Sequence, residues 1–404
     1  MLFSYMQKRA ILLSLFFQFF FLLPLLTACT RRSMGAKNES PPILPMSQST
    51  SRNSSQNVQQ MQISIEDTFP LRDVSFIDAN KALVFPGYIK ESIDDYAYPL
   101  LTNDGGSSWS RLQQETIKFR GTSFINSMEG WAVSKDSELW KTNDGGNTWT
   151  LISRLEYEGT VFTPRQILFL DENEGWGLET FALWHTEDGG KTWSKQQLPL
   201  TLSLFQFYNK NKGWICASNS APYTIYRTSD GGKTWDYKEI ANTYGAIYDL
   251  FFVNEQKGWL SSSNGIYCTK DGGTTWQNQK LPEQPVSNEL YISKGMVMQS
   301  LCFINEQEGW AAGYKIGRDE DFQPILLHTR DGGENWQISD VKIKGRKLSK
   351  ILFSNAQNGW LVAEVVIGEV EKDKTKIYHT SDRGNTWKEV LSLESPFAES
   401  RIGK

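Results

Sequence analysis

Hydrophobic and polar residues divide the chain into three parts with different patterns. Residues Ala10 to Leu26 are almost wholly apolar and follow the basic pair Lys8 and Arg9. Residues 30–62 are rich in Ser, Gln, Asn and Pro, which predicts a flexible tether because too few apolar side chains are present to form a core. From residue 63 onward, short runs of alternating apolar and polar residues are separated by Gly-rich turns, as in half-buried β-strands.

The first 28 residues have the features of an export signal, with a basic start, an apolar centre and small residues before a cleavage point. The following string, Leu26-Thr27-Ala28-Cys29, resembles the lipobox of bacterial lipoproteins, in which the Cys thiol receives a diacylglycerol. An uncleaved membrane anchor is the alternative, because 17 apolar residues approach a spanning length. We expect a signal peptide over 1–28, a lipidated Cys29 with a tether over 29–62, and a membrane-held, extracytoplasmic protein.

One motif, Thr-x-Asp-Gly-Gly-x-[Ser/Thr]-Trp, occurs seven times between residues 102 and 387. Its Asp can accept hydrogen bonds from the backbone ahead of it, and its Gly residues supply a positive φ, so the motif predicts a tight turn. Arg383 replaces the first Gly of the last copy, and Asn335 replaces the hydroxyl residue of the sixth. The motif residues are Asp104, Asp144, Asp188, Asp230, Asp271, Asp331 and Asp382, with Trp109, Trp149, Trp193, Trp235, Trp276, Trp336 and Trp387.

A Phe followed six residues later by Gly-Trp precedes six of the seven motifs, whereas the first unit has Ala82-Leu83 in place of Gly-Trp. Each unit therefore predicts four strands, A to D: strand A ends near the Phe, strand B starts at Gly-Trp, strand C ends at the motif Thr, and strand D starts at the motif Trp. A repeat of 40 or more residues with Gly and aromatic marks is typical of propeller blades.

The fold class we predict is all-β, a seven-bladed β-propeller of four-stranded antiparallel blades over residues 63–395. The last unit contains its own strand D near residues 387–391, so ring closure requires no swapped strand, although Ile63-Ser64-Ile65 could pair there. The predicted blades cover about 70–115, 116–155, 160–199, 200–242, 243–282, 298–341 and 345–393, followed by a tail over 396–404.

The Trp, His and Cys residues give no indication of a cofactor site or a catalytic centre, so we predict neither. Thirteen of the 15 Trp belong to the two motifs, so packing explains them better than a ligand platform does. His185, His328 and His379 each precede a motif Thr in different units, which places them far apart and predicts no shared metal site. Three Cys at non-equivalent positions predict buried free thiols, and a net charge of −4 gives no general attraction to nucleic acid. The Cys residues are Cys216, Cys268 and Cys302.

The paired motifs resemble the photosystem II stability and assembly factor family, over about residues 66–392, more than the sialidases that share the Asp box. The resemblance implies an exported protein, sometimes lipid-anchored, that acts without catalysis as an assembly scaffold for a membrane complex. Relatives also occur where there is no photosystem, so the partner stays open. We expect a monomeric propeller that binds an extracytoplasmic part of a membrane protein.

Three Arg residues form the candidate partner-binding site. Arg72, Arg120 and Arg165 each lie four residues before the strand-A Phe of the first three blades. The family is known for an Arg patch, and the resemblance implies one here, although the later blades have Ser203, Tyr248, Gln299 and Ser349 at that position. Three solvated Arg residues that brace local turns are the alternative.

Four long insertions are expected on the same face as these Arg residues, because B–C and D–A connections leave a four-stranded meander on one side. Loops on a rigid scaffold are where binding tends to reside. Several insertions are acidic, which predicts a face that is basic over blades 1–3 and acidic over blades 6, 7 and 1, unless the acidic loops serve only solubility. The insertions are Gly87–Tyr96, Leu281–Val297, Tyr314–Gln323 and Glu364–Lys376.

Two other functions remain open at this point. A glycan or cell-wall binder would use the same scaffold. A sialidase-like glycosidase would use an Arg triad for the substrate carboxylate, but the Arg-Ile-Pro string of sialidases is absent and seven units exceed the six blades of that fold.

Overall fold

The computed structural model describes residues 71–86, 99–112, 119–199, 201–217, 222–241, 243, 245–263, 265–282, 296–316, 322–340, 342–365 and 374–394. The predicted signal peptide, Cys29, the tether, Ile63-Ser64-Ile65 and the tail over 396–404 lie outside these residues. No helix within the described ranges has the length and apolarity needed to cross a membrane.

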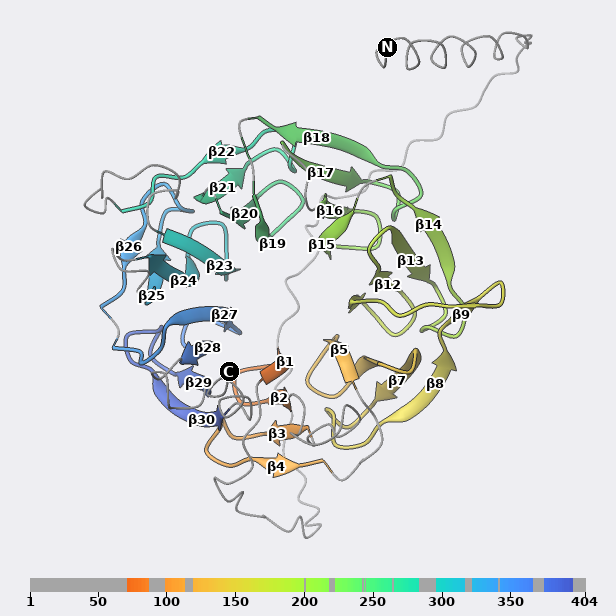
Figure 1. The fold of residues 1–404 in the computed structure, drawn as a ribbon, viewed down its shortest axis with the longest axis horizontal. Helices are drawn as coiled ribbons and strands as arrows, with labels where there is room; N and C mark the ends of the chain where they lie inside the picture. Colours follow the sequence, from red (N-terminus) through yellow and green to blue (C-terminus); the bar gives the residue numbers. More distant parts are fainter. Residues whose placement is uncertain are drawn as a thin grey trace, which may run out of the picture. The chain divides into compact units, whose positions relative to one another are not determined.

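Seven four-stranded antiparallel sheets surround a central axis, and each sheet takes its strands in sequence order from the axis outward (Figure 1). The predicted seven-bladed propeller is therefore confirmed. The blades, numbered 1 to 7, begin with β1, β5, β11, β15, β19, β23 and β27, which are their innermost strands.

The strand bounds in the first half are β1 (Leu71–Phe76), β2 (Ala82–Pro86), β3 (Leu100–Thr102), β4 (Ser110–Arg111), β5 (Phe119–Phe124), β6 (Gly130–Ser134), β7 (Glu138–Thr142), β8 (Thr150–Arg154), β9 (Glu156–Tyr157), β10 (Thr160–Val161), β11 (Gln166–Phe169), β12 (Gly175–Leu178), β13 (Ala182–Thr186) and β14 (Ser194–Gln197). Those in the second half are β15 (Leu202–Phe207), β16 (Gly213–Ala217), β17 (Tyr223–Thr228), β18 (Asp236–Ile240), β19 (Ile247–Phe252), β20 (Gly258–Ser262), β21 (Gly265–Thr269), β22 (Gln277–Asn278), β23 (Met296–Phe303), β24 (Gly309–Ile316), β25 (Phe322–Thr329), β26 (Gln337–Ile338), β27 (Lys347–Phe353), β28 (Gly359–Val365), β29 (Lys374–Thr380) and β30 (Lys388–Glu394).

The two sequence motifs set most strand ends. Every innermost strand ends at its Phe, every third strand ends at the motif Thr, and the second strand of blades 2 to 7 starts at Gly-Trp. Strand D starts one residue after the motif Trp, because that Trp still belongs to the turn: Trp149 Nε1 donates to Gly146 O at 3.1 Å within the same motif. A small hairpin, β9–β10, was not predicted. Its turn residues, Glu158 and Gly159, both have positive φ, as a two-residue hairpin turn requires.

The Asp box is a closed network of hydrogen bonds, illustrated by blade 4. Asp230 Oδ1 accepts from Thr228 Oγ1 at 2.7 Å and from Thr234 N at 2.9 Å, and Asp230 Oδ2 accepts from Thr234 Oγ1 at 2.6 Å. These bonds, the one from the Thr234 hydroxyl foremost, hold the pKa of Asp230 at about 2. In blade 6, Asn335 Nδ2 donates to Asp331 Oδ2 in place of the hydroxyl, which explains why that substitution is tolerated.

The hydrophobic core is divided into seven clusters, and each cluster joins two neighbouring blades. At six of these interfaces the Trp of Gly-Trp stacks on the strand-A Phe of the next blade, as for Trp259 on Phe303 with ring planes 7° apart. Trp259 Nε1 also donates to Gly332 O of the next box at 2.9 Å. The other pairs are Trp131–Phe169, Trp176–Phe207, Trp214–Phe252, Trp310–Phe353 and Trp360–Phe76.

The ring closes between blades 7 and 1 through side chains. Trp360 stacks on Phe76 and donates through Nε1 to Asp78 O at 3.0 Å. In the reverse direction, Trp109 Nε1 of blade 1 donates to Val390 O of blade 7 at 3.0 Å. The four strands of blade 7, β27 to β30, follow one another in the sequence, so no strand from the start of the described chain is exchanged into its sheet.

We expect Trp259→Ala to lower the free energy of unfolding by about 3–5 kcal/mol, because it leaves a cavity at a fully buried blade interface and removes the stack on Phe303. Urea denaturation followed by Trp fluorescence would measure the loss. Leu151→Ala is the control, since Leu151 is 48% exposed and its truncation should change the free energy by less than about 0.5 kcal/mol. Equal effects of the two substitutions would contradict the role of the stack.

Candidate partner-binding face

The antiparallel order of each blade gives the propeller two different faces. Innermost strands begin, and B–C connections occur, on one face, which we call the loop face. The turns after the strand-A Phe and the Asp boxes lie on the opposite face, which we call the box face. The position of the three predicted Arg residues, at the start of the innermost strands, therefore belongs to the loop face.

The position shared by the three Arg residues is a β-bulge for Arg72 and Arg120, whereas Arg165 lies just before its strand, which has no bulge. Six of the seven innermost strands have a register shift against the second strand, and each shift falls four residues before the Phe. A bulge breaks the regular alternation of the strand and re-aims a side chain, so this position differs physically from the rest of the strand. The bulge residues are Arg72, Arg120, Ser203, Tyr248, Gln299 and Ser349.

Arg120 and Arg165 lie on neighbouring innermost strands. Arg120 is exposed in β5, and the backbone beside it approaches blade 3: a Cβ on Gly121 would lie 3.6 Å from Arg165 O. Arg165 directly precedes β11; its Nη2 donates to Leu202 O of blade 4 at 2.5 Å, while its side chain stays exposed overall. Arg165 thus links two blades, a structural role that differs from the bracing of a local turn in the alternative interpretation. Arg72 occupies the bulge of β1, and its side chain lies outside the described part of the structure.

A second layer of charged residues follows one residue after the bulge. Lys350 of blade 7 lies 3.6 Å from Asp73 of blade 1 and donates to Val74 O at 2.6 Å. Asp249 of blade 5 accepts from Leu301 N of blade 6 at 2.8 Å. These bonds link innermost strands across blade interfaces. These residues were not predicted, because they lie one position after the one that the three Arg residues share. The charged residues at that next position, in different blades, are Asp73, Asp249 and Lys350.

Burial raises the pKa of Asp249 to about 6, and the hydrogen bonds from Leu301 N and Leu250 N oppose that rise. Ser300 Oγ adds a third bond, at 3.1 Å to Asp249 Oδ2. A carboxyl group with this pKa changes its charge within the range of ordinary buffers. We therefore expect the contact between blades 5 and 6 near the axis of the propeller to depend on pH.

Two further cations lie at the loop face, between blades 6 and 7. The Arg346 guanidinium lies 4.4 Å from the ring centre of Phe322, and Lys347 Nζ lies 5.0 Å from that of Tyr314. A cation over an aromatic ring is attracted by the negative face of the ring, which helps to hold these two side chains in place. The acidic residues predicted for this sector lie outside the described residues, so the predicted acidic half of the face stays a prediction. Those acidic residues are Glu91, Asp94, Asp95, Asp319, Glu320, Asp321, Glu369, Glu371 and Asp373.

The histidines and cysteines lie where the repeat predicted. His185, His328 and His379 belong to β13, β25 and β29 of three blades and do not form one site. Cys216, Cys268 and Cys302 are buried free thiols, and burial raises the pKa of each, that of Cys302 to about 12.

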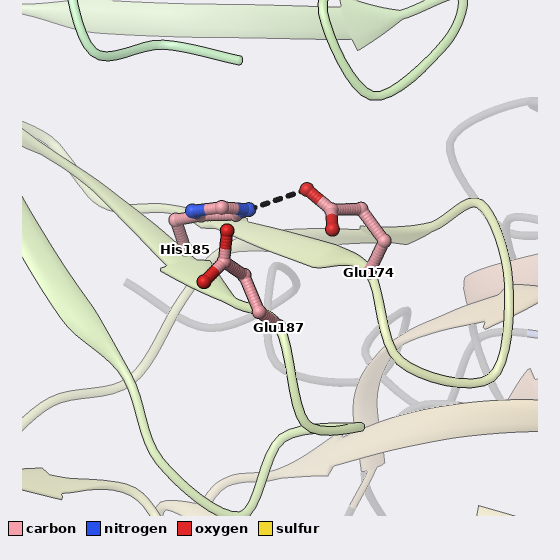
Figure 2. A group of neighbouring side chains, drawn as sticks. All are labelled: Glu174, His185 and Glu187. Atoms are coloured by element: carbon pink, nitrogen blue, oxygen red, sulfur yellow. Dashed lines mark hydrogen bonds and ion pairs between the residues drawn. The ribbon is translucent and has the colours of Figure 1, made fainter.

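Among the described residues, one group could hold a metal ion. It consists of Glu174, His185 and Glu187 on the box face of blade 3, with ligand atoms that lie within 4.8 Å of one another (Figure 2). The sequence did not predict this group, because His185 is separated from Glu174 by ten residues and the three histidines lie in different blades.

Comparison with known proteins points to one family. The family model described as "Photosynthesis system II assembly factor YCF48" matches residues 240–395. The chain is 29% identical over 146 residues to the chloroplastic photosystem II stability/assembly factor HCF136 of Arabidopsis thaliana, covering 35% of this chain and 31% of that protein. It is 28% identical over 143 residues to the photosystem II assembly lipoprotein Ycf48 of a Synechococcus strain, covering 34% and 35%. Each match thus spans about a third of the relative.

The solved structure titled "YCF48 bound to D1 peptide" aligns with a TM-score of 0.53 and 23% identity over 74% of this chain and 90% of that chain. At this identity the likeness shows that the two proteins share the fold.

We expect the stability difference between the wild type and Asp249→Asn to depend on pH. The Asp249 pKa is about 6 in the fold and near 3.8 when unfolded, so the folded state binds the proton more tightly. The stabilisation that the raised pKa of Asp249 gives to the folded state is complete below about pH 3.8 and is lost as the pH rises through about 6. The wild-type free energy of unfolding, minus that of the variant, should therefore fall as the pH rises across this range.

Urea denaturation at several pH values and constant ionic strength would measure this difference. Glu239→Gln on the outer strand β18 removes one exposed carboxylate and is the control for a general charge effect. A difference that does not change with pH for Asp249→Asn would contradict the raised pKa.

Proposed function

Because the chain is a distant homologue of the photosystem II assembly factors of the YCF48 and HCF136 type, we propose that it is a non-enzymatic scaffold for a membrane protein complex. In this proposal the loop face holds an extracytoplasmic segment of one membrane protein during assembly or maintenance of its complex. The propeller supplies a rigid platform, and the partner supplies the chemistry of the complex.

The observation that carries the proposal is the exposure of Arg120 and Arg165 on adjacent innermost strands of the loop face. Guanidinium groups bind carboxylates through paired, charge-assisted hydrogen bonds, so this position suits a partner segment that carries acidic side chains or a terminal carboxylate. We place Arg72 in the same basic arc, on the adjacent blade 1. A relative whose solved structure is titled as bound to a D1 peptide supports a peptide-like ligand for this chain also.

We further propose that the protein is anchored to the outer side of a membrane by lipid attached to Cys29, with residues 30–62 as the tether. The Synechococcus relative is named a lipoprotein, which supports this arrangement. Attachment of more than one acyl chain gives a stable anchor, whereas one chain binds only reversibly. The anchor would keep the loop face close to membrane partners without fixing its orientation.

The test combines in-membrane cross-linking with affinity purification of the wild type and of Arg72→Glu/Arg120→Glu/Arg165→Glu. We expect one membrane protein to co-purify stoichiometrically with the wild type and to be reduced at least about tenfold by the variant, because charge reversal opposes an acidic partner. Binding of the wild type should also weaken as salt is raised, since the contacts are exposed.

The control is Lys233→Glu/Lys238→Glu/Lys388→Glu, which makes the same change in net charge on exposed positions away from the axis. Circular dichroism should show that both triple variants are folded. Equal loss in the two variants would reject the Arg arc as the site. Failure of the wild type to capture any membrane protein, together with retention on purified cell-wall polymer or hydrolysis of a glycoside, would reject the scaffold itself.

A further inference from the structure

The Glu174, His185 and Glu187 cluster is built from two turns of blade 3 that the fold brings together. Glu174 directly precedes β12, His185 lies in β13, and Glu187 is the second residue of the Asp box. His185 Nε2 lies 2.6 Å from Glu174 Oε1, and the His185 ring stacks on Trp176 with ring centres 4.9 Å apart. Figure 2 shows the Glu174 carboxylate facing the imidazole and the Glu187 side chain rising toward the same ring.

Blade 6 contains the same arrangement with one difference. His328 Nε2 lies 3.3 Å from Glu308 Oε1, and the His328 ring stacks on Trp310 with ring centres 4.7 Å apart. The residue equivalent to Glu187 is Arg330. Burial lowers the pKa of His328, and the positive charge of Arg330 lowers it further. The His–Glu pair is thus a recurring cross-strand contact, and the second carboxylate is what distinguishes blade 3.

The third histidine is committed to another contact. His379 Nε2 lies 2.9 Å from Ala79 O of blade 1, so it belongs to the ring closure described above. Within the described chain, His185 is therefore the histidine that combines two nearby carboxylates with an imidazole nitrogen.

Two carboxylates and an imidazole in one cluster form a ligand set of two oxygens and one nitrogen. Two like charges this close are unfavourable unless a proton or a cation neutralises them. Zn²⁺ accepts both His nitrogen and carboxylate oxygen at about 2.0–2.2 Å, and three protein ligands leave a position for water. We propose that Glu174, His185 and Glu187 bind a divalent cation of the Zn²⁺ class on the box face of blade 3.

Small movements would complete the site. Ligands about 2.1 Å from a tetrahedral ion lie about 3.4 Å apart, so Nε2 and Oε1 must separate slightly from 2.6 Å and the Glu187 carboxylate must move closer. Glu187 is exposed and can change rotamer, whereas the stack on Trp176 holds the His185 ring in place. The bound ion would join the turn before β12 to the Asp box after β13. Since this site lies on the face opposite Arg120 and Arg165, it is independent of the proposed partner-binding face.

The experiment is a titration of the full-length protein, purified in detergent without a polyhistidine tag, with Zn²⁺ by calorimetry and with Co²⁺ by visible absorption. We expect one equivalent of metal for the wild type. Glu187→Arg copies the blade 6 arrangement and should weaken binding at least about tenfold, as should His185→Ala, because each removes one of three ligands. The reciprocal change, Arg330→Glu, completes the ligand set of blade 6 and should add a second equivalent.

The matched control is His328→Ala, which removes the histidine that lacks the second carboxylate and should leave the stoichiometry at one. Co²⁺ bound to the wild type should give a visible band that is lost in Glu187→Arg. The proposal is overturned if the wild type binds no metal, or if Glu187→Arg and His185→Ala both bind metal as the wild type does. Because Glu187→Arg reproduces an arrangement already present in blade 6, loss of folding would not explain a loss of binding.

Discussion

The stack of a strand-B Trp on the strand-A Phe of the next blade is the interaction on which the rest of the propeller depends. A single four-stranded sheet with two apolar faces cannot be stable alone, so each blade must cover its neighbour. The stack fixes the distance between neighbouring blades. The indole N–H fixes their relative position along the propeller axis by donating to the next Asp box, as Trp259 does to Gly332 O. The Asp boxes and the core therefore stabilise the same interfaces: the box turn supplies the hydrogen-bond acceptor, and the Trp ring supplies the packing.

Positions near the axis carry the structural irregularities that give the two faces their different properties. The bulges lie toward the loop face, where side chains such as Arg120 are exposed. One residue after the bulge, Asp249 and Lys350 connect neighbouring innermost strands. The box face has regular geometry in all seven blades, so a single substitution there, such as Glu at position 187 where blade 6 has Arg330, changes the local chemistry without changing the fold.

The repeat made the fold predictable from the sequence, because each motif marks a strand end for a physical reason. The Asp box needs its Thr, Asp and Gly at fixed spacing to close its hydrogen bonds, so strand C ends where the motif begins. The β9–β10 hairpin was not predicted, because Glu158 in its turn is an unusual residue for a positive φ. The proposed metal-binding group could not be predicted, because Glu174 comes close to His185 only through the pairing of β12 with β13. The link that Arg165 makes between two blades could not be predicted either, because its acceptor is a carbonyl of another blade.

The interface between blades 1 and 2 differs in its packing from the other six interfaces of the ring. There Leu83 occupies the place of the Trp, packing in the cluster that includes Phe124, so this seam has a branched aliphatic contact where the other six have stacked rings. Phe85 of blade 1 still meets Phe119 of blade 2 edge to face at this interface, with ring centres 5.7 Å apart. Blade 1 is held to blade 7 by a ring stack and two indole hydrogen bonds. The first and last blades of the propeller are therefore joined by the same kind of stacked contact as neighbouring blades elsewhere in the ring, so its closure needs no continuous backbone between them.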